Sequence, residues 1–353
     1  MDTFLQQIIN GIAQGSAYAL IALGYTMVYG VLRLINFAHG DVFMFGAFMG
    51  YYLASSPWIA GAFGNSALTA AVVIVGAMAL SAGLGILIER FAYRPGRSKT
   101  RFAMAFWLGI LGAFAGQLAY PSAAGIALGA AIGIVAGLGV EMAGIKPARQ
   151  KSRLTLLIIA IGVSLFLENA GQQTFGADPK APPQIIPSAV FHVGNLTINS
   201  QQVVVIGVAI VLMILLNLVV NRTKTGTAMR AVSFNLDAAK LMGIDTDRII
   251  AFTFALGSAL AAAGGILYSM LYPRIDPLMG VMPGLKAFVA AVLGGIGNMT
   301  GAMLGGLVLA LAEVMAVGYG RSSYRDATAF IILVLILLLR PSGILGKGIS
   351  EKV

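Results

Sequence analysis

Long apolar runs alternate with short polar segments along the whole chain. A membrane-crossing helix needs about 20 apolar residues. About eleven runs approach or reach that length, at residues 5–32, 42–56, 66–88, 102–120, 122–143, 154–175, 202–220, 250–272, 280–297, 301–318 and 326–340. The runs are continuous and do not alternate with period two, which excludes the strands of a transmembrane barrel. The pattern therefore predicts an all-α polytopic membrane protein, because backbone groups in lipid must be satisfied within the chain.

One polar segment between two runs has a helical pattern of its own. It is "GTAMRAVSFNLDAAKLMGID" at 226–245, and its apolar residues recur at helical spacing: Val232, Leu236, Ala239 and Met242. Asn235 is suited to cap a short helix and Gly243 to end it. Such a helix either lies in the lipid interface or docks into a groove of a soluble partner. Its alanines and terminal glycine favour docking, because they allow close approach.

The basic residues indicate how the chain is oriented. Most of the 23 Lys and Arg residues fall in alternate loops, and 226–245 belongs to this basic set. The opposite loops hold five: Lys180, Arg274, Lys286, Arg321 and Arg325. By the positive-inside rule we expect the N-terminus outside, the C-terminus inside and residues 226–245 in the cytoplasm. The Pro-containing loop 176–200 would then lie outside, as a cap over a pathway or as a plain connector.

Composition and motifs narrow the function. Hydrophobic residues make up 58% of the chain and charged residues only 10%, against roughly 25% charged in soluble domains. There is no cysteine for disulfides. No metal-ligand or catalytic-triad pattern occurs, and "GILGKGIS" at 343–350 lacks the spacing of a phosphate-binding loop. We expect a non-enzymatic chain that binds no cofactor and no nucleic acid.

Two internal repeats stand out. "ERFAYRPGRSKTR" (89–101) matches "EMAGIKPARQKSR" (141–153) at an offset of 52 residues. This match favours a duplication over a chance likeness of two basic loops. The duplication would have inserted a hairpin at 102–153 into a single transmembrane domain that spans 1–353. The second repeat pairs "GDVFMFGAFMG" (40–50) with "GNMTGAMLGG" (297–306). It indicates interrupted helices at matching points of two halves, or only two Gly-rich spans that look alike.

Several segments resemble one known family. They are "LQQIINGIAQGSAYALIALGYTMVYGVLRLINFAHGDVFMFGAFM" (5–49), "ERFAYRPGR" (89–97), "LLIIAIGVSLFLEN" (156–169), "DAAKLMGI" (237–244), "IIAFTFALGSALAAAGGIL" (249–267), "GLKAFVAAVLGGIGNMTGAMLGGLVLALAE" (284–313) and "LLLRPSGILG" (337–346). The chain is similar to the H-type permeases of high-affinity branched-chain amino acid ABC importers. The likeness covers nearly all of the chain outside 102–153. Its motifs do not separate amino acid permeases from related urea permeases.

The resemblance implies a permease subunit in the bacterial inner membrane, surrounded by lipid. Its partners would be a second homologous permease, two cytoplasmic ATPase subunits that carry ATP and Mg²⁺, and a periplasmic amino acid-binding protein. The cargo would be leucine, isoleucine or valine. The ATPase-coupling segment would be residues 235–243, with Asn235, Asp237, Ala238, Ala239, Lys240, Leu241, Met242 and Gly243. Residues 102–153 depart from the family pattern, as does Glu168, where the family commonly has Gln.

Candidate residues of a substrate path or gate are the polar groups within or beside the runs: Asn36, His39, Asp41, Glu168, Asn298 and Glu313. Ionisable groups inside a membrane are costly and are often functional. The first three could instead form a hydrogen-bonded turn, the two Glu residues could be structural, and Asn298 is better suited to cap a helix. The alternative function for the whole chain is that of an ion-coupled secondary transporter, which would need no docking helix.

Overall fold

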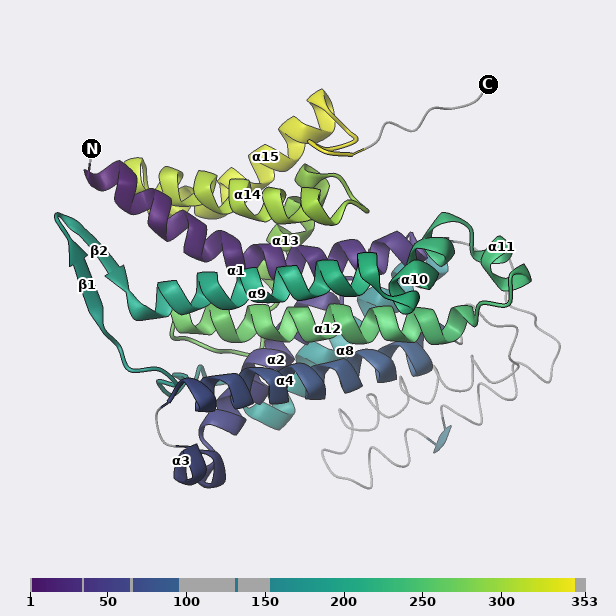
Figure 1. Ribbon diagram of the computed structural model, residues 1–353, viewed down its shortest axis with the longest axis horizontal. Coiled ribbons are helices and arrows are strands. Elements are labelled where there is room, and N and C mark those ends of the chain that lie inside the picture. Colours follow the sequence, from purple (N-terminus) through teal and green to yellow (C-terminus); the bar gives the residue numbers. More distant parts are fainter. Residues whose placement is uncertain (1, 34, 64–65, 95–130, 133–152, 347–353) are drawn as a thin grey trace. The chain divides into compact units, whose positions relative to one another are not determined.

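A computed structural model of the 353-residue protein describes residues 2–33, 35–63, 66–94, 131–132 and 153–346 (Figure 1). The chain divides into two compact units. The first contains residues 1–87 and 160–353, and the second contains residues 88–159. The expected hairpin at 102–153 lies outside the described residues except for 131–132. In the second unit the described residues are helical from Ile88 to Tyr93 and from Arg153 onward.

The described residues are almost entirely helical, as the apolar runs predict. The elements are α1 (Asp2–Leu32), α2 (His39–Ala54), α3 (Pro57–Phe63), α4 (Ala67–Ile88), η1 (Glu89–Tyr93), α8 (Arg153–Phe175), β1 (Val190–Val193), β2 (Leu196–Asn199), α9 (Ser200–Arg222), α10 (Lys224–Phe234), α11 (Leu236–Leu241), α12 (Thr246–Leu271), α13 (Val281–Gly294), α14 (Met299–Tyr319), η2 (Ser322–Tyr324) and α15 (Arg325–Leu339).

Among the described residues, six helical segments are long and apolar enough to cross a membrane. They are Asp2–Leu32, Ala67–Tyr93, Ser200–Arg222, Thr246–Leu271, Met299–Tyr319 and Ser322–Leu339. Each coincides with a run expected from the sequence. The run expected at 154–175 is also helical, as α8. These observations establish a polytopic helical membrane protein.

Helix α1 forms the centre of the first unit. It contacts α9, α12, α13 and α14 (Figure 1), and its residues from Ala13 to Val28 are buried. Glycines allow the backbones to approach closely. A Cβ atom added to Gly306 of α14 would lie 2.7 Å from the backbone nitrogen of Ala19 in α1. The bundle is therefore held by small residues at helix crossings, as is usual inside membranes.

Two short helices begin inside this bundle. Helices α2 and α13 have only 16 and 14 residues, so a crossing at either place must combine helix with non-helical chain. Their first turns meet, because a Cβ at Gly40 would lie 2.4 Å from the carbonyl oxygen of Gly280. The likeness of 40–50 to 297–306 had left two interpretations open, matching interrupted helices or two Gly-rich spans that look alike. Each segment lies at the start of a helix, α2 at His39 and the 21-residue α14 at Met299.

The loop at 176–200 contains a feature that the sequence analysis did not predict. Strands β1 and β2 form an antiparallel hairpin, and its tip residue Gly194 has a φ of +63°. The hairpin is fixed to the start of α1, where the Gln6 side chain donates to the Thr197 carbonyl and accepts from its N–H, each at 2.9 Å. The fold is therefore all-helical apart from this small hairpin in the described residues.

Candidate functional site

The polar segment at 226–245 is helical, but it forms two helices rather than one. They meet at Asn235, whose Oδ1 accepts the N–H groups of Asp237 and Ala238, each at 3.0 Å. Gly243 has a φ of +80°, a conformation that suits glycine and follows the last turn of α11. The predicted cap at Asn235 and the predicted end at Gly243 are both confirmed.

The exposed face of this segment differs from the one expected. Seven of its candidate coupling residues are exposed: Asn235, Asp237, Ala238, Lys240, Leu241, Met242 and Gly243. Ala239 is buried. Met242 was expected to share its face with Ala239, but α11 ends at Leu241 and Met242 is 82% exposed. The helical-spacing prediction was wrong here, because it assumed a continuous helix through Met242.

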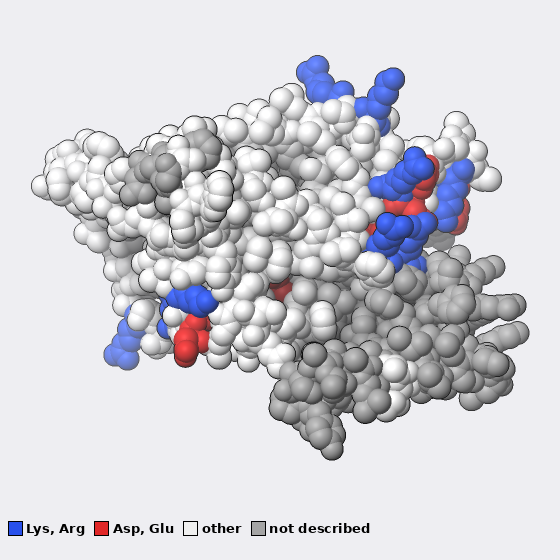
Figure 2. Space-filling model, turned by 90° about the horizontal axis from the view of Figure 1, so that it is seen from below, with Lys and Arg blue, Asp and Glu red and all other residues white. Residues whose placement is uncertain are grey.

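Three large apolar side chains stand out at this end of the bundle, and we call them the apolar tip: Phe234, Leu241 and Met242. Their exposed fractions are 86%, 89% and 82%. Charged side chains of both signs gather at the end of the molecule that carries α10 and α11, as Figure 2 shows. An exposed apolar tip beside a charged surface has the chemistry of a protein-docking site.

A second polar cluster lies inside the bundle, and we call it the buried charge network: Lys286, Glu313, Arg325 and Asp326. Lys286 Nζ lies 3.0 Å from Glu313 Oε1 and 2.7 Å from Asp326 Oδ1. The Lys286 and Glu313 side chains are almost fully enclosed, while Asp326 is half exposed. Because charges buried in a helical bundle are costly unless paired, this network ties α13, α14 and the start of α15 together.

The second oxygen of Glu313 faces α1. Gln14 Nε2 donates to Glu313 Oε2 at 2.8 Å and the Tyr18 hydroxyl donates at 3.2 Å. Arg325 Nε is 3.9 Å from the same oxygen. Glu313, on α14, therefore has partners on three other helices: α1, α13 and α15. Of the two roles open to it in the sequence, the structure shows a structural one, and Glu313 does not line the pocket described below.

Lys286 corrects an expectation from the sequence. It was counted with the loop residues on the non-cytoplasmic side, but it lies within α13 and is buried. The signal that could have found it is a lone Lys inside an apolar run, followed by a lone Glu in the next run. A lone Lys and a lone Glu in neighbouring spans are better explained by an ion pair inside the membrane than by placing each of them in a loop.

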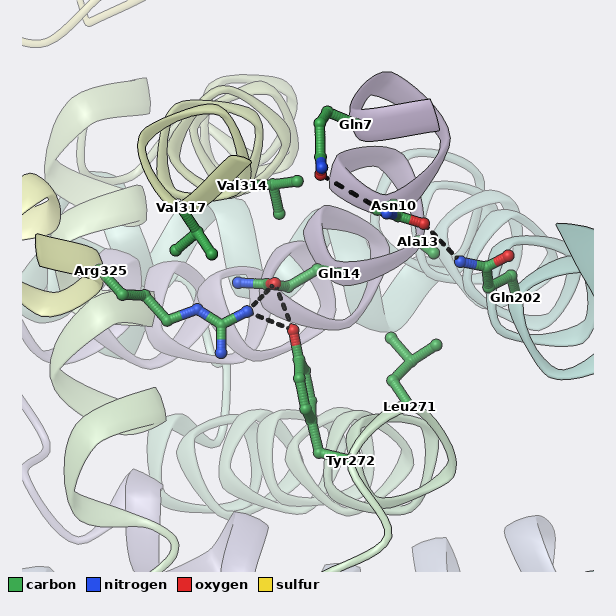
Figure 3. A pocket seen from close by; sticks show the side chains of 10 residues that line it. All are labelled: Gln7, Asn10, Ala13, Gln14, Gln202, Leu271, Tyr272, Val314, Val317 and Arg325. Carbon is green, nitrogen blue, oxygen red and sulfur yellow. Dashed lines mark hydrogen bonds between the residues drawn. The ribbon is translucent and has the colours of Figure 1, made fainter. Parts of the chain in front are cut away.

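A pocket of about 240 Å³ lies beside this network, at the end of the bundle where α1 begins (Figure 3). It is lined from α1, α9, α12, α14 and α15 by Gln7, Asn10, Ala13, Gln14, Gln202, Leu271, Tyr272, Val314, Val317 and Arg325. Arg325 Nη2 donates to Gln14 Oε1 at 3.0 Å and to the Tyr272 hydroxyl at 2.5 Å. None of the six candidate path residues lines this pocket, so the sequence analysis did not predict it.

The polar residues around the start of α2 are packed inside the bundle. His39 Nε2 lies 3.2 Å from the Ile21 carbonyl in the middle of α1, and Ser164 donates to Asp41 Oδ2 at 2.5 Å. The backbone carbonyl of Asn36 accepts the His39 N–H at 3.1 Å. A Cβ at Gly24 would lie 2.5 Å from the His39 ring. This is a hydrogen-bonded turn, one of the two readings that the sequence allowed.

The remaining two candidates lie apart from one another. Glu168 is partly exposed on α8, one turn beyond Ser164. Asn298 Oδ1 accepts the Gly301 N–H at 3.2 Å and so caps α14, as the sequence predicted. Its Nδ2 also donates to the Leu345 carbonyl at 2.9 Å, which fixes the chain after α15. Four of the six candidate path residues therefore gather at the start of α2, because Glu168 lies close enough to Asp41 to interact with it electrostatically, whereas Glu313 and Asn298 belong to other contacts.

The fold and these sites define a polytopic helical membrane protein with an internal polar pocket and an exposed apolar tip. Comparison with known proteins is consistent with this class. The family model described as "branched-chain amino acid transport system / permease component" matches residues 7–111 and 100–339. The chain therefore belongs to this permease family. No solved structure matches it.

Two relatives are similar over nearly their whole length. The high-affinity branched-chain amino acid transport system permease protein LivH of Escherichia coli (strain K12) is 37% identical over 354 residues, with 99% of this chain and 98% of the relative covered. BraD of Pseudomonas aeruginosa carries the same description and has the same identity and coverage. The fructose import permease protein FrcC of Rhizobium meliloti is 25% identical over 244 residues, or 65% of this chain.

Proposed function

We propose that this chain is the transmembrane permease subunit of an ATP-driven importer for leucine, isoleucine and valine in the bacterial inner membrane. The observation that carries the proposal is the 37% identity to LivH and BraD across 99% of the chain. The chain itself hydrolyses no ATP.

The orientation follows from charge. Arg222, Lys224, Arg230, Lys240 and Arg248 are exposed at the end of the bundle with α10 and α11 (Figure 2). Basic loops stay in the cytoplasm, so we place this end inside and the N-terminus and the β-hairpin outside. This orientation keeps the eleven crossings expected from the sequence, with the C-terminus inside.

The apolar tip would be the contact with an ATPase subunit. The end of a helix can dock into a groove on a soluble partner when its apolar side chains are exposed and few of them contact the core of their own protein. Leu241 and Met242 project, whereas buried Ala239 holds α11 to the protein. Movement of a docked ATPase would therefore be passed through α11 to α12, whose first residues follow Gly243 closely.

The complete importer would contain a second homologous permease, two ATPase subunits with ATP and Mg²⁺, and an extracytoplasmic amino acid-binding protein. The binding protein would deliver cargo to the outer end of the bundle. ATP binding would bring the ATPases together and switch the pathway between outward and inward access. No nucleic acid takes part.

Uptake by proteoliposomes tests the cargo. The importer, with ATP inside and its binding protein outside, is offered labelled leucine, isoleucine, valine, urea, fructose and arginine. We expect the three branched-chain amino acids to accumulate and the others to remain outside. Accumulation of urea or fructose without leucine would contradict the proposal. The matched control is the same import assay without the binding protein.

A further inference from the structure

The pocket beside the buried charge network has the size of a small metabolite. Its volume is about 240 Å³, below the roughly 300–1,000 Å³ of pockets that hold drug-sized ligands. It opens near the N-terminal end of α1 and is not lined by the packed turn around His39. The proposed orientation puts this end of the bundle outside, where a binding protein would release cargo.

The pocket has one charged lining residue, Arg325. Its side chain is 30% exposed. Its Nε atom faces Glu313 Oε2 at 3.9 Å, and its Nη2 atom donates to Gln14 and Tyr272. A guanidinium matches the geometry of a carboxylate and can bind it with two parallel hydrogen bonds. With no acidic residue in the lining, the pocket favours a ligand with one carboxylate and disfavours a second cationic group.

The remaining lining divides into amides and apolar walls. Gln7, Asn10, Gln14 and Gln202 bring side-chain amides, whose oxygens accept hydrogen bonds from an ammonium group. Ala13, Leu271, Val314 and Val317 form the apolar wall. Figure 3 shows the amides of Gln7, Asn10 and Gln202 joined in one hydrogen-bonded row, away from Arg325. The ammonium and carboxylate of an amino acid share one carbon, so their partners must be neighbours, and Gln14 is the amide that lies beside Arg325.

We infer that this pocket binds a zwitterionic amino acid with an aliphatic side chain, as an entry site within a single permease chain. The inference rests on the proposed function for its cargo and orientation. The carboxylate binds Arg325, the ammonium binds Gln14 Oε1 beside it, and the side chain packs against Val314 and Val317. Ligand binding competes with Gln14 and Tyr272 for Arg325, and Gln14 also donates to Glu313.

Saturation-transfer NMR tests the site, because it detects weak ligands. The assembled importer in lipid nanodiscs, without binding protein, is mixed with L-leucine, L-leucinol or 4-methylvalerate. We expect transfer to the leucine methyl groups, and a signal at least about tenfold weaker for leucinol, which lacks the carboxylate. 4-Methylvalerate, which lacks the ammonium, should also bind more weakly. Wild-type protein that gives no leucine signal would overturn the inference.

Two variants have matched controls. Val317→Phe fills the pocket, while Val308→Phe changes an exposed residue on the same helix. Arg325→Gln removes the cation, while Arg321→Gln removes an exposed Arg that does not line the pocket. We expect both pocket variants to lose the leucine signal by about tenfold, and both controls to keep it. If Arg325→Gln does not fold, the leucine signal of Val317→Phe still tests the inference.

Uptake separates this inference from the proposed function. If the wild-type importer accumulates leucine and Val317→Phe binds and imports it normally, the entry site is wrong and the function stands. If the wild type imports another cargo and not leucine, the proposed function fails whatever the pocket variants do. The expected result is a raised KM for leucine in Val317→Phe, while Val308→Phe keeps the wild-type KM.

Discussion

Lys286 and Glu313 form an ion pair that is almost fully enclosed by the bundle. Removing one partner leaves the other charge buried without its counter-ion, which typically costs about 3–5 kcal/mol. We therefore predict that Lys286→Met lowers the free energy of unfolding in detergent by about that amount. Glu313→Gln should cost less than Lys286→Met, because the amide keeps hydrogen bonds to Gln14 and Tyr18.

The control for this prediction is Arg248→Met. Arg248 pairs with Asp245, but the two side chains are 87% and 52% exposed, and exposed pairs contribute about 1 kcal/mol or less. Denaturation with SDS, followed by circular dichroism, measures all three variants. If Lys286→Met costs no more than Arg248→Met, the buried charge network does not stabilise the bundle.

Single residues were predicted from the sequence where local structure decides their role. The caps at Asn235 and Asn298 follow from helix starts and were correct. Lys286 was counted with the loop residues although the expected run 280–297 contains it, because a single Lys in an apolar run gives no sign of its partner. Its partner Asp326 lies 40 positions away in the sequence, and only the packing of α13 against α15 brings them together.

At the scale of helices, close packing of α2 and α12 depends on Gly46. A Cβ there would lie 2.2 Å from the Ala262 Cα, and backbone cannot move aside cheaply. We predict that Gly46→Ala lowers the free energy of unfolding by about 1–3 kcal/mol. Gly83→Ala is the control, because a Cβ at Gly83 meets nothing within 4 Å. Equal stability of the two variants would mean that α2 and α12 are not packed as described.

Helix α11 gives the second prediction at this scale. Leu241→Ser removes an apolar side chain that the chain itself does not bury, so folding should be unchanged while docking weakens. We expect the importer's ATPase activity to lose its stimulation by leucine-loaded binding protein. Lys224→Ser, an exposed change on the same surface, should keep it. Ala239→Arg is a poor test, because Ala239 is buried and its effect would mix docking with folding.

Hydropathy predicts the existence of the long helices but not the ends of the short ones. Runs 42–56 and 280–297 correspond to α2 at His39–Ala54 and α13 at Val281–Gly294. Their starts depend on contact between Gly40 and Gly280, which is tertiary. The β-hairpin had a local signal that was passed over. "VFHVGNLTIN" at 190–199 contains two strand-like segments around Gly-Asn, a common hairpin turn.

For the whole molecule, the prediction concerns sidedness. The chain has no cysteine, so single cysteines can be introduced at Ser98, Ser152 and Ser188 without a background. Ser98 and Ser152 flank the proposed hairpin 102–153, which crosses twice and returns to the same side. We predict that both react with membrane-impermeant thiol reagents only from the cytoplasm, and that Ser188 reacts from outside. Opposite sidedness of the first two would contradict the inserted hairpin.

The central claim is that this chain forms the pathway of an importer driven by ATP, and the energy source tests it most directly. Initial leucine uptake is measured in proteoliposomes that contain ATP, no ATP, or a non-hydrolysable ATP analogue, with Na⁺ and proton gradients imposed or collapsed. We predict uptake only with hydrolysable ATP inside and leucine-loaded binding protein outside, whatever the ion gradients. Leucine uptake driven by an ion gradient without ATP would contradict the account and identify a secondary transporter.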